Sequence, residues 1–248
     1  MGGFDLDMEK TYEYNDPLVE GLDDTTVKLL SSLFDAIKSI GIDYIRYVHH
    51  YENPKSKSAT STSIERSNEE ISHVERIFAY ELYRQWHDQD VIRNTPGFVI
   101  NAEIPKQLID NLYHDEGHLY YPDMVLHFGQ NTYNNNYIIC EIKRKEYVES
   151  YPEKLNEDIK KLCIYVDERT KPKADVQDWE PYKLGVFIMT VKELKKNEKE
   201  KYSLDLIYKH LSQDILSLED RIPKKIFCVI YDGKELKYDT LYNMIKMQ

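Results

Sequence analysis

The sequence lacks the features that mark membrane and secreted proteins. It has no run of eighteen or more apolar residues, so we expect no helix that crosses a bilayer. Residues 1–5 contain neither the basic nor the apolar part of a signal peptide. The 3 cysteines, Cys140, Cys163 and Cys228, form no CxxC pair and lie in apolar runs, which predicts buried thiols and neither disulfides nor a zinc site. We therefore expect a cytoplasmic protein.

Positive charge is also in short supply. Lys and Arg number 33 against 44 Asp and Glu, which gives a net charge of −11. A protein that holds DNA by electrostatics alone is basic overall. The lysines are nevertheless segregated from the acid-rich segments, and they gather at residues 143–145, 154–161, 171–173 and 192–201. The net charge therefore weighs against nucleic acid as a partner without excluding it.

The first 63 residues are a candidate appendage to the rest of the chain. Residues 1–24 are acidic and aperiodic, whereas the apolar residues of 25–52 recur at helical spacing and predict an amphipathic helix interrupted at Gly41. Residues 53–63 are rich in Ser and Thr, which is typical of a linker. We therefore divide the chain into an acidic, helical appendage with a linker at 1–63 and a main domain at 64–248.

The main domain alternates between helical and strand-like patterns. We expect helices at 66–88, 152–168 and 203–218, and strands at 98–104, 121–128, 137–143, 184–190 and 225–231, the last with a short return strand. The segment at 184–190 is apolar throughout, which favours a central, parallel strand. This order predicts an α/β fold with a central mixed β-sheet flanked by helices.

Strand parity brings polar side chains together at the end of two of these strands. Residues two apart on a strand share a face, so Glu141 and Lys143 point the same way, while Asp123 begins the preceding strand. If 121–128 and 137–143 pair as a hairpin, two carboxylates and an ammonium group converge. Two carboxylates suit a hard divalent ion such as Mg²⁺, and a neighbouring lysine can orient or deprotonate a water molecule. This set is suited to hydrolysis of a phosphodiester.

The same residues resemble a known sequence pattern. Pro122-Asp123, followed after 17 intervening residues by Glu141-Ile142-Lys143 at the end of an apolar strand, is similar to the motif of the PD-(D/E)xK nucleases. The short string of an acid, any residue and Lys occurs five times in this chain, but only at 141–143 does it end such a strand. The resemblance covers residues 66–190 and implies a restriction-endonuclease-like core.

The resemblance also implies roles for individual residues. Asp123 and Glu141 would bind Mg²⁺ or Mn²⁺, the Ile142 carbonyl is a candidate third ligand, and Lys143 would be the catalytic lysine. A helix before the core strands often supplies another acid in this family, and Glu75 matches it in type and order. A carboxylate on an apolar helix stripe is costly unless something pairs with it, which also favours Glu75 over Glu81.

Other polar residues are candidates for contact with the substrate or for support of the site. Glu103, Lys145 and Lys161 are candidates for contact with the substrate. Asp158, Lys161 and Tyr165 form a polar stripe on the helix at 152–168, for which a solvated face is the favoured interpretation and support of the site the alternative.

We therefore expect a metal-dependent nuclease that acts on DNA in preference to RNA. A role in bacterial or phage defence is suggested by analogy alone. The main alternative is a non-catalytic or partner-dependent subunit that retains the nuclease fold, which the acidic charge would suit. Residues 1–63 are the candidate contact for a second copy of the chain or for a protein partner.

Overall fold

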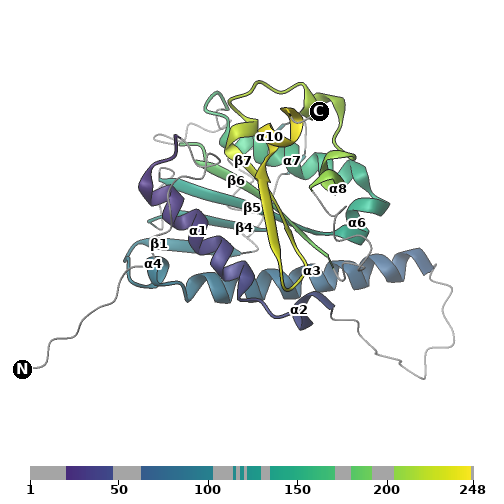
Figure 1. The fold of residues 1–248 in the computed structure, drawn as a ribbon, viewed down its shortest axis with the longest axis horizontal. Helices are drawn as coiled ribbons and strands as arrows, with labels where there is room; N and C mark the ends of the chain where they lie inside the picture. The colour runs from purple at the N-terminus through teal and green to yellow at the C-terminus, as the bar shows by residue number, and fades with distance from the viewer. Residues whose placement is uncertain are drawn as a thin grey trace, which may run out of the picture.

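The computed structural model describes residues 21–46, 63–102, 114–115, 118–119, 122–129, 135–170, 180–191 and 204–246. These residues form an α/β structure in which helices cover both faces of one mixed sheet (Figure 1). No helix in these ranges is both long enough and apolar enough to cross a membrane.

The sheet has six strands in the order β1-β4-β5-β6-β7-β8. Their bounds are β1 Phe98–Ala102, β4 Met124–Phe128, β5 Asn136–Arg144, β6 Leu184–Thr190, β7 Ile226–Tyr231 and β8 Leu236–Thr240. The strands β1, β4 and β5 are antiparallel neighbours, β5, β6 and β7 are parallel, and β8 returns antiparallel to β7. The predicted mixed sheet is therefore confirmed. So is the central, parallel position of β6, whose residues are all buried.

The hairpin between β4 and β5 is the part of the sheet that matters most for the site. Met124 lies opposite Cys140, and the amide of Asp123 donates to the Cys140 carbonyl oxygen at 3.1 Å. This register confirms the predicted hairpin. It also places Asp123, which immediately precedes β4, beside the last residues of β5.

Helices form a layer on each face of the sheet. Their bounds are α1 Asp24–Lys38, α2 Asp43–Arg46, α3 Ser63–His87, α4 Asp90–Arg93, α6 Lys145–Ser150, α7 Pro152–Val166, α8 Asp205–Tyr208, α9 Gln213–Leu216 and α10 Leu241–Lys246. One core cluster joins α1 and α3 to the sheet, and the other joins α7 and α10 to its opposite face. Alternate residues of β4, β5, β6 and β7 therefore enter opposite cores, as the period of two requires.

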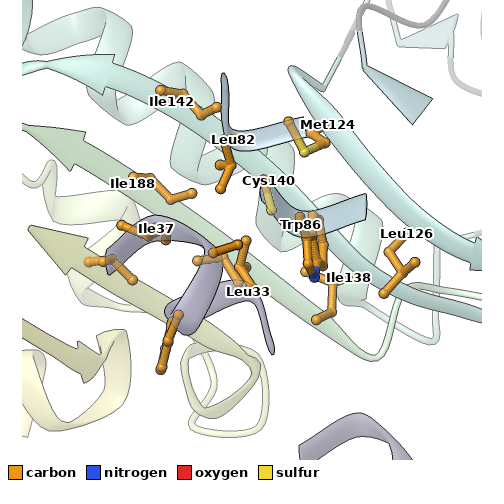
Figure 2. Packing of buried hydrophobic residues seen from close by; sticks show 14 of the residues in the cluster. Leu33, Ile37, Leu82, Trp86, Met124, Leu126, Ile138, Cys140, Ile142 and Ile188 are labelled. Atoms are coloured by element: carbon orange, nitrogen blue, oxygen red, sulfur yellow. The ribbon is translucent and has the colours of Figure 1, made fainter. Parts of the chain in front are cut away.

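The helix α1 packs directly on the sheet. Figure 2 shows Leu33 and Ile37 from α1 in one cluster with Leu82 and Trp86 from α3 and with Ile188 from the sheet. Asp23 caps the N-terminus of α1, because its side chain accepts a hydrogen bond from the amide of Thr26 at 3.0 Å. The described part of residues 1–63 thus shares a core with the sheet. The proposed division at residues 63 and 64 stays a prediction.

A buried hydrogen bond links α1 to α3 and allows this packing to be tested. The Ser32 hydroxyl donates to the Leu29 carbonyl oxygen at 2.7 Å and accepts from Trp86 Nε1 at 3.0 Å. We expect Ser32→Ala to lower the free energy of unfolding by about 1–3 kcal/mol, because the buried indole N–H loses its partner. Urea denaturation measures the change.

The matched control is Ser39→Ala. The Ser39 hydroxyl makes a similar bond to the Asp35 carbonyl oxygen at 2.8 Å, but on the exposed surface. We expect this variant to lie within about 0.5 kcal/mol of the wild type. Equal losses from both variants would show that the contact between α1 and α3 contributes nothing beyond an ordinary helix serine.

The prediction of one helix at 203–218 is wrong. Two short helices, α8 and α9, replace it, with a break at 209–212. The Asn156 side chain in α7 bridges this break, since its amide donates to the His210 carbonyl oxygen at 2.8 Å and its oxygen accepts from the amide of Ser212 at 2.6 Å. Contacts from a distant helix therefore stabilise an interruption that the local apolar pattern does not indicate.

Smaller differences concern the ends of elements. The first main-domain helix begins three residues earlier than expected, at Ser63, while α7 ends at Val166 and β4 begins at Met124. The sequence also did not indicate α10 or the separate two-stranded pairing of β2 (His114–Asp115) with β3 (His118–Leu119). These short elements carry too few residues for a periodic pattern.

Candidate active site

Charged side chains converge at the carboxyl end of β5, a strand that α3, α6 and α7 contact. Figure 1 shows where these helices lie around the sheet. The cluster consists of four carboxylates and two lysines, which we call the acid–lysine cluster: Glu75, Asp123, Glu141, Asp158, Lys143 and Lys161. Glu75 comes from α3, Asp158 and Lys161 come from α7, and the others come from the β4–β5 hairpin. Three separate layers of the fold thus contribute to one site.

Asp123 is partly open to solvent, with 37% of its side chain exposed against 9% for Asp158 and 1% for Glu141. Its Oδ2 atom accepts a hydrogen bond from the amide of Ile142 at 2.7 Å and lies 3.7 Å from Lys143 Nζ. The backbone of β5 therefore fixes the position of this carboxylate. The predicted approach of Asp123 to the end of β5 is present in the structure.

Glu141 is the most buried member, with 1% of its side chain exposed. Its Oε1 atom accepts from Lys161 Nζ at 2.9 Å, while Oε2 has no hydrogen-bond partner in the part of the chain that the structure describes. Burial raises the pKa of Glu141 well above its ordinary value, and the charges of Asp123 and Asp158 add to this effect against the opposing lysines. A cation close to Glu141 therefore stabilises its ionised form.

Lys143 lies among the carboxylates with 15% of its side chain exposed. Its Nζ atom donates to the Ile142 carbonyl oxygen at 3.1 Å and lies 3.4 Å from Asp158 Oδ2. Burial alone would lower the pKa of Lys143, but Asp123, Asp158, Glu141 and Glu75 together raise it well above its ordinary value. In this arrangement Lys143 is a charged hydrogen-bond donor and not a base.

Glu75 reaches the cluster from α3, on the opposite side of β5 from α7. Its Oε1 atom accepts from the amide of Arg144 at 3.1 Å. Glu81, the rejected alternative, is bound instead to Arg84 at 2.6 Å and to Gln85 at 2.8 Å. The preference for Glu75 thus agrees with the contacts, whereas its role at the site stays a prediction.

The ionisation of Glu75 predicts a pH-dependent effect on stability. Burial raises its pKa from 4.5 to about 7, with Lys143 and the Arg144 amide opposing the shift. Between these values the folded protein holds a proton that the unfolded chain releases, so stability falls as the pH rises from 4.5 through 7. Glutamine cannot ionise, so we expect the unfolding free energy of Glu75→Gln, relative to that of the wild type, to be roughly 2–3 kcal/mol higher at pH 8 than at pH 5. Urea titrations in EDTA at both pH values measure this difference.

Glu81→Gln is the control on the same helix. Its pKa is lowered by the hydrogen bond from Arg84, so it is ionised in both the folded and unfolded states over this pH range. The difference in unfolding free energy between Glu81→Gln and the wild type should therefore be the same at pH 5 and pH 8. A Glu75→Gln difference that is also independent of pH would contradict the burial of an ionised Glu75.

The interpretation of the stripe on α7 as a solvated face is wrong. Asp158 and Tyr165 are buried, and Lys161 retains 13% of its side-chain exposure. Lys161 Nζ donates to Asp158 Oδ1 and Glu141 Oε1, each at 2.9 Å. Asp158 was expected at the site only in the alternative interpretation, as support for it. The signal that could have identified it is its place beside the apolar stripe of a helix that packs on the strand carrying Glu141.

The two other residues expected to contact the substrate are Glu103 and Lys145. Glu103 lies outside the described residues, and Lys145 Nζ lies 3.7 Å from Glu149. Further along, Lys154 pairs with Glu157 at 2.7 Å and Lys160 with Asp214 at 2.8 Å. The described lysines around the cluster are thus already close to carboxylates.

The oxygen atoms of the cluster suit a hard divalent ion in type. Carboxylates and backbone carbonyls are the ligands that Mg²⁺ and Mn²⁺ prefer, and Glu141 supplies a buried oxygen without a partner in the described ranges. In the arrangement as it stands, no three His, Cys, Asp or Glu side chains of the described residues are grouped as a metal site. The ammonium groups of Lys143 and Lys161 instead balance part of the carboxylate charge.

Fold and site together define an α/β protein with a charged cluster at the end of a hairpin strand. Comparison with family models, curated proteins and solved structures finds no match to this chain.

Proposed function

We propose that this protein is a Mg²⁺- or Mn²⁺-dependent nuclease of the PD-(D/E)xK type that acts on DNA in preference to RNA. The observation that carries the proposal is the meeting of Asp123, Glu141 and Lys143 at one end of the β4–β5 hairpin. The order of elements supports it as well: α3, the antiparallel strands β1, β4 and β5, then α7 and the parallel strand β6. This is the order expected for a restriction-endonuclease-like core.

The proposed chemistry assigns a task to each residue. Asp123, Glu141 and the Ile142 carbonyl would hold the ion, which supplies Lewis-acid activation of the phosphodiester and of a water molecule. Lys143, held as an ammonium by its four acidic neighbours, would donate a hydrogen bond to the charge that develops on the phosphate oxygens. Glu75 would complete the carboxylate set from the α3 side.

A second candidate is a binding or assembly subunit that acts only with a partner. The observation in its favour is the charge around the site, because a phosphate backbone would have to compete with the carboxylates paired to Lys145, Lys154 and Lys160. The net charge of −11 acts in the same direction. A partner protein that supplies positive charge would remove this obstacle.

The test is incubation of the purified protein with supercoiled plasmid, single-stranded DNA and RNA, each in Mg²⁺, Mn²⁺ or EDTA. We expect cleavage of DNA that requires the ion. Identically purified Lys143→Met and Asp123→Asn proteins detect a contaminating nuclease. Ion-independent cleavage, or equal cleavage by the variants, would contradict the nuclease. Binding of Mn²⁺ without cleavage of any substrate would favour the partner-dependent subunit.

A further inference from the structure

Two residues of α7 lie in the acid–lysine cluster without belonging to the proposed catalytic set. Lys161 Nζ is held between Asp158 Oδ1 and Glu141 Oε1, at 2.9 Å from each. Asp158 retains 9% of its side-chain exposure, Lys161 13% and Glu141 1%, so this chain of three ionisable groups is largely shielded from solvent. Buried ionisable groups offset the cost of leaving water only when their geometry is good and hydrogen bonds satisfy their polar atoms.

This arrangement provides a hydrogen bond to only one of the two carboxylate oxygens of Glu141. Lys161 binds only Oε1, and Oε2 is buried without a hydrogen-bond partner among the residues that the structure describes. A carboxylate held at one oxygen cannot rotate freely, so the direction of its other oxygen is fixed as well. Groups that orient a metal ligand in this way strongly affect the affinity of metal sites.

We propose that Lys161 and Asp158 are positioning residues: Lys161 holds Glu141 Oε1 so that Oε2 is directed to a divalent cation, and Asp158 holds Lys161. This inference rests on the proposed function, because it concerns the ion that Asp123 and Glu141 would bind. Asp158 acts through Lys161 and does not itself bind the ion. Lys143 lies 3.4 Å from Asp158 Oδ2, which links the positioning pair to the proposed catalytic lysine.

The test measures Mn²⁺ affinity by calorimetry on the full chain, without substrate. Lys161→Met keeps most of the side-chain volume but removes the ammonium, and it should weaken Mn²⁺ binding about 10- to 100-fold. Lys160→Met is the matched control, because Lys160 is the adjacent residue of α7 but pairs with Asp214 on the exposed surface at 2.8 Å. Its affinity should equal that of the wild type. Thermal unfolding in EDTA confirms that each variant is folded.

A double-variant comparison separates positioning from direct binding. Asp158→Ala should weaken Mn²⁺ binding about tenfold, and it provides the measurement if Lys161→Met does not fold. The double variant should bind no more weakly than Lys161→Met alone, since Asp158 acts through Lys161. Additive losses would mean that Asp158 binds the ion itself, and they would overturn the proposal.

The EPR spectrum of bound Mn²⁺ gives a readout that general destabilisation does not alter. It should change in Lys161→Met, because Glu141 loses its fixed orientation, and it should stay unchanged in Lys160→Met. If the wild type binds Mn²⁺ through Asp123 but Lys161→Met shows the same affinity and spectrum, the positioning role is overturned and the nuclease proposal stands. If the wild type shows no Mn²⁺ binding that depends on Asp123, both are overturned.

Discussion

Replacement of Lys143 by methionine should lower the rate of Mn²⁺-dependent DNA cleavage by about 10²–10³-fold, while Mn²⁺ still binds. The reason is the place of the ammonium group. It lies 3.7 Å from Asp123 Oδ2 and donates to the Ile142 carbonyl oxygen, so it adjoins the proposed ligands without being one of them. Methionine keeps most of the side-chain length and volume and removes the charged donor.

Cleavage rates at saturating Mn²⁺, together with calorimetric Mn²⁺ affinities, test this prediction. Lys160→Met is again the control, because its ammonium pairs with Asp214 away from the cluster. It should cleave at the wild-type rate. Unchanged cleavage by Lys143→Met, with the ion still bound, would exclude Lys143 from the chemistry.

Replacement of Asp123 by asparagine should strongly weaken ion binding and, with it, cleavage. Asp123 Oδ2 accepts from the amide of Ile142 at 2.7 Å, and the amide oxygen of asparagine can accept the same bond. The hairpin should therefore keep its form while the site loses one carboxylate charge. Changes to groups that only orient a ligand cost about 10- to 100-fold in affinity, so loss of a ligand's charge is expected to cost about a hundredfold or more.

The matched control is Asp239→Asn on β8. Asp239 is also a carboxylate that accepts from a backbone amide, that of Thr240 at 2.7 Å, but it lies three strands away from β5 in the sheet. Calorimetry with Mn²⁺ and the plasmid assay should show wild-type behaviour for this control. Mn²⁺ binding by Asp123→Asn at the wild-type affinity would show that the centre lies elsewhere.

The two variants are expected to fail in different ways, and the difference separates the roles of the two residues. Lys143→Met should bind the ion and cleave slowly, whereas Asp123→Asn should lose most of its ion binding and, with it, cleavage. If both variants lost only cleavage, Asp123 would not be a ligand. If both lost ion binding, the ammonium group would be needed to assemble the site.

The hairpin and the face of its charged residues could be predicted from the sequence because they depend on local periodicity. A strand alternates its faces every residue, so Glu141 and Lys143 had to share a face once 137–143 was recognised as a strand. Pairing with the next strand upstream then placed Asp123 beside them. Glu75 was identifiable for a related reason, since a carboxylate on an apolar helix stripe needs a partner.

The rest of the cluster depended on how α7 is rotated against the sheet. Sequence periodicity shows that a helix has an apolar stripe, but not which polar residues beside the stripe meet the strand beneath. Asp158 and Lys161 therefore resembled a solvated face. In the folded protein they lie over β5, where the buried charge of Glu141 is stabilised by the nearby ammonium group.

The predicted hairpin and its charged end were thus determined by the sequence alone, because neighbouring residues on a strand fix each other's direction. The packing of α1 into the core, the break between α8 and α9 at Asn156, and the inward turn of Asp158 and Lys161 were decided only by tertiary structure. Each of these depends on contacts between segments far apart in the chain. For such contacts, the free energy of burying a group is set by the partner it meets and not by its neighbours in sequence.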